Sequence, residues 1–75
     1  MNSDGYIAIL VPSTSYALRA EKILHMAGIA CKLIPVPRSL SSDCGVCVRI
    51  MEEDAEAAQR ELERAHVAVE GFRPL

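Results

Sequence analysis

The chain has 75 residues, enough for one domain around a single hydrophobic core. Its ten acidic and eight basic residues give a formal net charge of −2, and the scattered basic residues give no sign of a nucleic-acid or anionic-membrane surface. No uncharged run is long and apolar enough to span a bilayer, and the start of the chain lacks the basic residues of a secretory signal. We therefore expect one cytoplasmic domain over residues 1–75, with a flexible start at 1–5 and no nucleic-acid or membrane partner.

Strand-like and helix-like segments alternate along the chain. In chain order the pattern predicts strands at residues 6–11, 31–35, 45–50 and 67–72. A helix is expected after Ser13 and Thr14, which are good N-cap residues, and it should end near Gly28. Three acidic residues at 52–54 mark the start of a second helix, where the helix dipole favours negative charge.

The two halves of the sequence match each other at an offset of 38 residues. Residues Ala17, Ala20, Leu24, Ala27 and Ala30 fall onto Ala55, Ala58, Leu62, Ala65 and Ala68. Two βαβ units in succession, with right-handed crossovers, predict an α+β fold of the ferredoxin-like βαββαβ type. It would have a four-stranded antiparallel sheet with two helices on one face. The first and third strands would be central, and Pro35 would lie in an edge strand.

Alternation along the strands predicts which side chains face the helices. On the third strand this set is Val46, Val48 and Ile50, and the repeat adds Tyr6, Ala8 and Leu10 from the first strand. The opposite, uncovered face would then carry Ile7, Ile9 and Val11. Three branched apolar side chains on an open face would form an exposed patch, so we expect a homodimer, or another partner protein, to bury it.

The three cysteines are an odd number, which favours reduced thiols over a disulfide framework. Cys31 begins an edge strand with the parity of Leu33, and we expect it to pack as a small apolar side chain. Cys44 and Cys47 form a Cys-x-x-Cys pair, but extended backbone would separate them by about 10 Å, beyond the ~7 Å limit of a disulfide. A redox pair therefore requires Cys44 to bend back, and Cys47 is expected to pack on the sheet.

Cys44 ends a polar loop, and its chemistry depends on its neighbours. Arg38 could stabilise a thiolate, whereas the charge of Asp43 would oppose it, so a chemical and a structural role both stay open. Gly45 would allow close backbone approach. The amides that follow Ser13 and Thr14 could hold an anion or a terminal sulfur species, although capping is the simpler interpretation.

Metal binding is not expected. His25 and His66 lie on or beside the helices, without ligand spacing to the cysteines, and are interpreted as solvated helix-end residues. We expect no metal and no cofactor.

Several motifs along the chain resemble one known family. They are Pro12-Ser13-Thr14, Ala17-Leu18, Ala20-Glu21-Lys22, Gly28-Ile29, Leu33-Ile34-Pro35-Val36-Pro37-Arg38 and, most specifically, Leu40-Ser41-Ser42-Asp43-Cys44-Gly45. These residues resemble the selenium/sulfur carrier protein-like domains of bacteria and archaea, over nearly the whole chain. Such domains stand alone or are fused to a sulfur-carrier module of the SirA/TusA type. The resemblance implies that Cys44 is the family's cysteine and could bear a persulfide or selenopersulfide.

We therefore expect a carrier rather than an enzyme, with donor and acceptor proteins as its partners. Cys44 would be the carrier thiol and Cys47 a possible second thiol. The residues expected to shape the site are Arg38, Ser41, Ser42, Gly45, Ser13 and Thr14. Two alternatives remain: an interaction or regulatory module that assembles through its open sheet face, and a thiol redox protein that uses Cys44 and Cys47.

Overall fold

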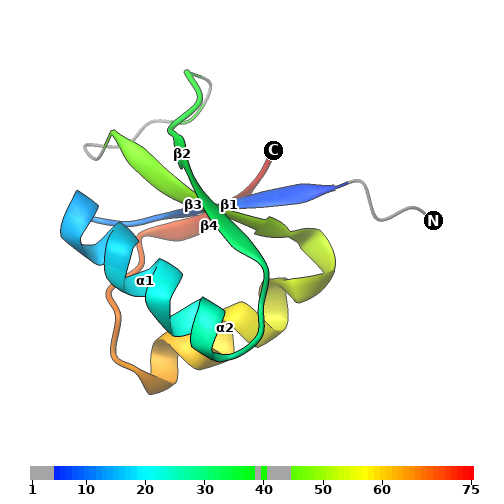
Figure 1. The fold of residues 1–75 in the computed structure, drawn as a ribbon. Coiled ribbons are helices and arrows are strands. Elements are labelled where there is room, and N and C mark those ends of the chain that lie inside the picture. Colours follow the sequence, from blue (N-terminus) through cyan, green and yellow to red (C-terminus); the bar gives the residue numbers. More distant parts are fainter. Residues whose placement is uncertain (1–4, 39, 41–44) are drawn as a thin grey trace.

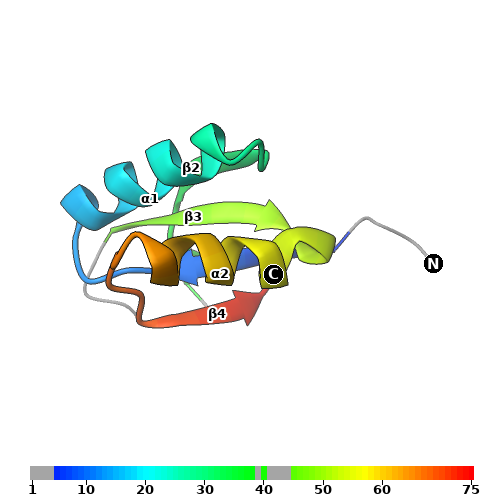
Figure 2. The ribbon, with the colours of Figure 1, turned by 90° about the horizontal axis from the view of Figure 1, so that it is seen from below.

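The computed structural model describes residues 5–38, 40 and 45–75. In chain order the elements are β1 (Tyr6–Leu10), α1 (Thr14–Met26), β2 (Cys31–Pro35), β3 (Val46–Met51), the short 3₁₀ helix η1 (Glu52–Asp54), α2 (Ala55–Arg64) and β4 (Gly71–Pro74). The strands form one antiparallel sheet in the order β2-β3-β1-β4. Both helices lie over the same face of this sheet (Figure 1, and seen from the helix side in Figure 2).

This arrangement confirms the predicted α+β class, with β1 and β3 in the centre of the sheet. Pro35 lies in β2 and Pro74 in β4, the two edge strands, where a residue without a backbone N–H is tolerated. The predicted flexible start falls outside the described residues, apart from Gly5.

The fourth strand begins later than predicted, at Gly71 rather than at residue 67. The backbone before it is bonded elsewhere: the N–H of Val67 donates to the carbonyl of Leu62 at 3.0 Å. Val67 is also buried in the core. The alternating valines of this segment therefore pack beneath the end of α2, and pairing with β1 starts only where the chain reaches the sheet edge.

Both helices end in the same way, at positions 38 residues apart. The N–H of Ile29 donates to the carbonyl of Leu24 at 2.9 Å, as the N–H of Val67 does to that of Leu62. The residue between has a left-handed conformation in each case, with a φ of 79° at Gly28 and 58° at His66. These are Schellman ends, in which the apolar residue after the left-handed one packs back on the helix. The internal repeat therefore extends to the way in which each helix stops.

The predicted faces of β1 are wrong. Ile7, Ile9 and Val11 lie in the core under the helices, because Ile9 pairs with Val48 and Ile7 with Ile50 across the sheet. The opposite face instead holds Ala8, Leu10 and Cys47. The three branched side chains on which the homodimer prediction rested are therefore covered by the protein's own helices.

A one-residue difference between the two halves explains this error. The repeat aligns the helices correctly, since Ala20 and its counterpart Ala58 are both fully buried. However, Ile9 precedes Ala20 by 11 positions, whereas its sheet partner Val48 precedes Ala58 by 10. A shift of one residue moves every side chain of a strand to the other face, so an alignment made on the helices reverses the faces of β1.

Candidate functional site

The connection between β2 and β3 and the start of α1 lie at the same end of the sheet, where β1 finishes and β3 begins. Because β1 and β3 are antiparallel, the end of β1 that leads into α1 lies beside the start of β3 (Figure 1). Ser13 and Gly45 therefore lie at the same end of the sheet. Of the predicted site, Ser41, Ser42 and Cys44 lie outside the described residues, as does Asp43.

The described part of the hairpin connection has a defined backbone. The N–H of Val36 donates to the carbonyl of Gly45 at 3.1 Å, which extends the β2–β3 ladder beyond its last strand pair. The N–H of Leu40 donates to the carbonyl of Pro37 at 3.0 Å. Arg38 is exposed and forms no ion pair with any described residue. The connection thus leaves a cation at its surface.

Gly45 does not meet a close neighbour in the described part of the chain. A Cβ at this position would have no described atom within 4 Å, and its φ is not in the left-handed region. The predicted close approach of backbone is therefore not seen among these residues.

The start of α1 differs in one detail from the prediction. Ser13 is the N-cap residue, with extended backbone angles, and its carbonyl accepts a hydrogen bond from the N–H of Ala17 at 3.1 Å. Its side chain makes no capping hydrogen bond, and the first turn contains no acidic residue. Thr14 is exposed. The side chain of Ser13 therefore does not cap the helix, and the positive end of the helix dipole is not neutralised by it.

Cys31 is a packing cysteine, as predicted. It lies against the core, and its Sγ donates a weak hydrogen bond to the carbonyl of Glu21 at 3.7 Å. Burial of the thiol and the nearby negative charge of Glu21 both raise its pKa. Cys31 is therefore held as the neutral thiol at physiological pH, which makes it a poor nucleophile.

Cys47 faces away from the helices, also as predicted. Its side chain is 0% exposed and packs with Ala8 and Leu10 on the open face of the sheet. Three partly buried apolar side chains pack against this cluster: Ile34, Val36 and Leu40. The thiol is thus excluded from solvent in this structure.

The histidines lie where the sequence places them. His25 is exposed in the last turn of α1, and His66 is exposed just after α2. Within residues 5–38, 40 and 45–75, no three or more His, Cys, Asp and Glu side chains gather as a metal site would require. None of the described helices is long and apolar enough to cross a membrane.

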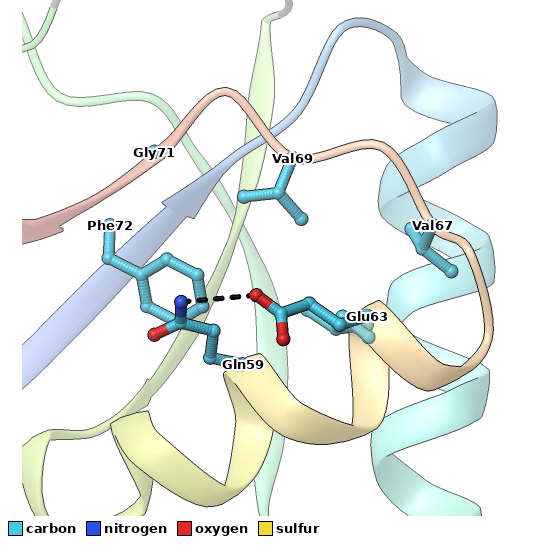
Figure 3. Close-up of a pocket in the computed structure, with 7 residues that line it drawn as sticks. Gln59, Glu63, Val67, Val69, Gly71 and Phe72 are labelled. Carbon is cyan, nitrogen blue, oxygen red and sulfur yellow. Dashed lines mark hydrogen bonds between the residues drawn. The ribbon is translucent and has the colours of Figure 1, made fainter.

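A cavity of about 360 Å³ lies between α2 and β4, at the sheet edge opposite β2 (Figure 3). Val69 and Phe72 line it, and at its rim Gln59 Nε2 donates to Glu63 Oε2 at 3.3 Å. None of the predicted site residues lines this cavity, and it contains no cysteine. No pattern in the sequence indicates this cavity, because the segment that closes it has the alternation of a strand.

Basic residues that are scattered along the sequence come together on the open face of the sheet. Lys32 pairs with Arg49, Arg49 with Ala8, and Ala8 with Arg73. Since directly paired residues share a face, these three cations lie in one row across all four strands. We call Lys32, Arg49 and Arg73 the basic row. The row exists because Ala8 and Arg73 share the open face with Arg49, which the strand pairing of β1 and β4 sets.

Comparison with known proteins gives one result. The model of a family described as "Putative Se/S carrier protein-like" matches residues 6–74, nearly the whole chain. No curated protein and no solved structure matches the chain significantly. The motifs that resemble this family in the sequence and the match to its model agree, and the chain belongs to the Se/S carrier protein-like family.

Proposed function

We propose that this protein carries sulfane sulfur or selenium on Cys44, as a persulfide or selenopersulfide. Membership of the Se/S carrier protein-like family supports the carrier role. The observation that carries the choice of thiol concerns the other two cysteines. Cys31 is held as a neutral thiol against the core, and Cys47 is fully buried. Cys44 is the remaining cysteine, and it directly precedes the exposed Gly45.

The transfer requires only an accessible thiolate. The Cys44 thiolate attacks the terminal sulfur of a donor persulfide, the donor's S–S bond breaks, and the donor's thiolate leaves. The terminal sulfur ends on Cys44 with no net oxidation or reduction. Attack by an acceptor thiolate reverses the process, and a selenium atom in place of the terminal sulfur follows the same course. A reducing cytoplasm would keep the thiol available.

The surroundings of the hairpin support this chemistry. Arg38 is an exposed cation without an ion pair among the described residues, so it is available to stabilise a thiolate or perthiolate. The start of α1, at Ser13 and Thr14, lies at the same end of the sheet as the hairpin connection. The helix dipole favours negative charge there. In this proposal Ser41 and Ser42 shape the loop that presents Cys44.

We also propose that the fold is of the ferredoxin-like type. The element order β-α-β-β-α-β and the strand order β2-β3-β1-β4 support this assignment. It would follow from two βα units that share one sheet.

Intact mass tests the carrier proposal. The protein is incubated with a cysteine desulfurase and L-cysteine, or with selenide and an oxidant, and then weighed without reductant. We expect the wild type to gain single sulfur or selenium atoms and Cys44→Ser to gain none. Cys31→Ser is the matched control and should gain as much as the wild type. An adduct on Cys44→Ser equal to that on the wild type would refute the proposal.

A further inference from the structure

The basic row is a continuous feature of the open sheet face. Its three residues lie on β2, β3 and β4, with Ala8 of β1 between Arg49 and Arg73. Neighbouring strands are about 4.8 Å apart, so the row spans about 14 Å from edge to edge of the sheet. This width suits a series of negative groups better than one small anion.

Carboxylates are segregated from this row. In the described part of the chain, the acidic residues lie on the helices, in η1 or just before β4: Glu21, Glu52, Glu53, Asp54, Glu56, Glu61, Glu63 and Glu70. The ion pair between described residues joins Arg64 to Glu61 on α2, at 3.6 Å. No member of the basic row has an ion pair with a described residue. The overall charge of −2 therefore conceals an acidic helix layer and a basic sheet face.

Two of the three cations are held in place over the sheet. The Arg49 guanidinium lies over the ring of Tyr6, 4.4 Å from the ring centroid. Arg73 folds back over Gly71, where its Nη1 would be 2.8 Å from an added Cβ, and the same nitrogen donates to the carbonyl of Phe72 at 3.1 Å. Fixed side chains lose less rotamer entropy when they pair with a partner.

An apolar area adjoins the row on the same face. Ile34, Val36 and Leu40 pack there and remain partly exposed. Leu40 belongs to the hairpin connection that also contains Arg38. Protein interfaces commonly combine an apolar centre with charged groups around it. The open face has both, and its apolar part lies toward the hairpin.

We propose that the open sheet face is a docking surface for an acidic protein, the partner that exchanges sulfur or selenium with this carrier. The identity of that partner as donor or acceptor rests on the proposed function; its acidic character rests on the basic row alone. Carboxylates of the partner would pair with Lys32, Arg49 and Arg73. A partner seated there contacts Leu40, and so lies next to the hairpin connection.

Other occupants fit this face less well. A second copy of the chain, packed face to face, would set one row of cations against another, which is repulsive. Single-stranded nucleic acid is bound largely by stacking of bases on aromatic rings, and here the Arg49 guanidinium covers one face of Tyr6.

Poly-L-glutamate is a probe for the acidic partner, read by amide chemical shifts of the ¹⁵N-labelled protein at low salt. We expect shifts that concentrate on Lys32, Arg49 and Arg73. The triple variant Lys32→Glu/Arg49→Glu/Arg73→Glu should bind about tenfold or more weakly, because it removes three attractive charges and places three repulsive ones in the row. Binding by the wild type should weaken as salt is added.

A matched control makes the same change of charge on the helix layer. The variant Arg19→Glu/Lys22→Glu/Arg60→Glu also replaces two arginines and one lysine, all exposed. It should weaken binding of poly-L-glutamate clearly less than the row variant does, because its charges lie on the helix layer and act on a chain bound at the row only over a distance. If Arg49→Glu prevents folding, Lys32→Glu/Arg73→Glu changes only exposed positions of the two edge strands.

Three results would overturn the docking proposal: equal weakening in the control variant, tighter binding of an oligo-dT of matched charge than of poly-L-glutamate, or self-association that the row variant abolishes. The probe carries no sulfur, so these results do not depend on Cys44. Loading of Cys44 by polysulfide tests the carrier role separately. If polysulfide does not load the wild-type protein, the carrier role is refuted. The poly-L-glutamate titration would still decide whether the basic row binds acidic chains.

Discussion

Gly28 is the position at which one added methyl group should reveal the most about this fold. It ends α1 with a φ of 79°, and a Cβ there would meet no described atom within 4 Å. Any cost of Gly28→Ala therefore comes from the backbone conformation rather than from a clash. A left-handed conformation costs an L-residue roughly 1–2 kcal/mol.

The smaller entropy of the unfolded chain offsets part of this cost, by about 0.4–1 kcal/mol. The net loss of unfolding free energy should thus be about 1 kcal/mol. For a domain of this size, that loss lowers Tm by about 4–8 °C. Urea denaturation followed by circular dichroism gives the free energy, and a thermal scan gives the Tm.

Gly45→Ala is the matched control for this substitution. Gly45 is also exposed and also has open space around its Cβ position, but its φ is not left-handed. The same methyl group should therefore leave stability unchanged or raise it by up to about 1 kcal/mol. Equal destabilisation by both substitutions, or no effect of Gly28→Ala, would refute the reasoning from backbone conformation.

The remaining predictions use the same folded protein. His66→Gly should raise the unfolding free energy by about 0.5–1 kcal/mol in urea, because it relieves the left-handed strain that follows α2. Leu24→Ala should lower it by about 2–5 kcal/mol, since the side chain is fully buried. Iodoacetamide should label Cys47 only after unfolding, as seen by peptide mass mapping. The rate of alkylation of Cys31 should rise with pH about a midpoint above the ordinary thiol pKa. The stability that comes from the raised pKa of Cys31 should be present below the pKa of this thiol in the unfolded chain and lost as pH rises through its pKa in the folded protein.

Sequence reasoning succeeded where one local pattern decides the structure. The alanine and leucine spacing around Ala20 and Ala58 identifies the two helices, because burial along a helix follows its own period. The central positions of β1 and β3 followed from the repeat of βα units. The proline of β2 correctly marked an edge strand.

It failed where the answer depends on how two elements are joined. The face of Ile9 is set by the length of the connection to α1, which differs by one residue from that of the second half. The start of β4 is set by the end of α2, because the N–H of Val67 bonds to the carbonyl of Leu62 in the Schellman end and not to β1. The basic row depends on the register of three strand pairs, and no single segment contains it. For the candidate site, the packing of Cys31 and Cys47 is confirmed, while the roles of Cys44 as carrier thiol and of Cys47 as second thiol stay predictions.

The contact between Arg49 and Tyr6 gives the protein a built-in optical probe. The chain has two tyrosines and no tryptophan, so tyrosine emission is not masked by a stronger fluorophore. Tyr16 lies on α1, in the helix layer, and its replacement by phenylalanine would leave Tyr6 as the single emitter. A ligand that draws the Arg49 guanidinium off the ring changes the surroundings of that emitter directly. Binding of a ligand to the open sheet face can thus be followed by the intrinsic fluorescence of Tyr6, without an added label.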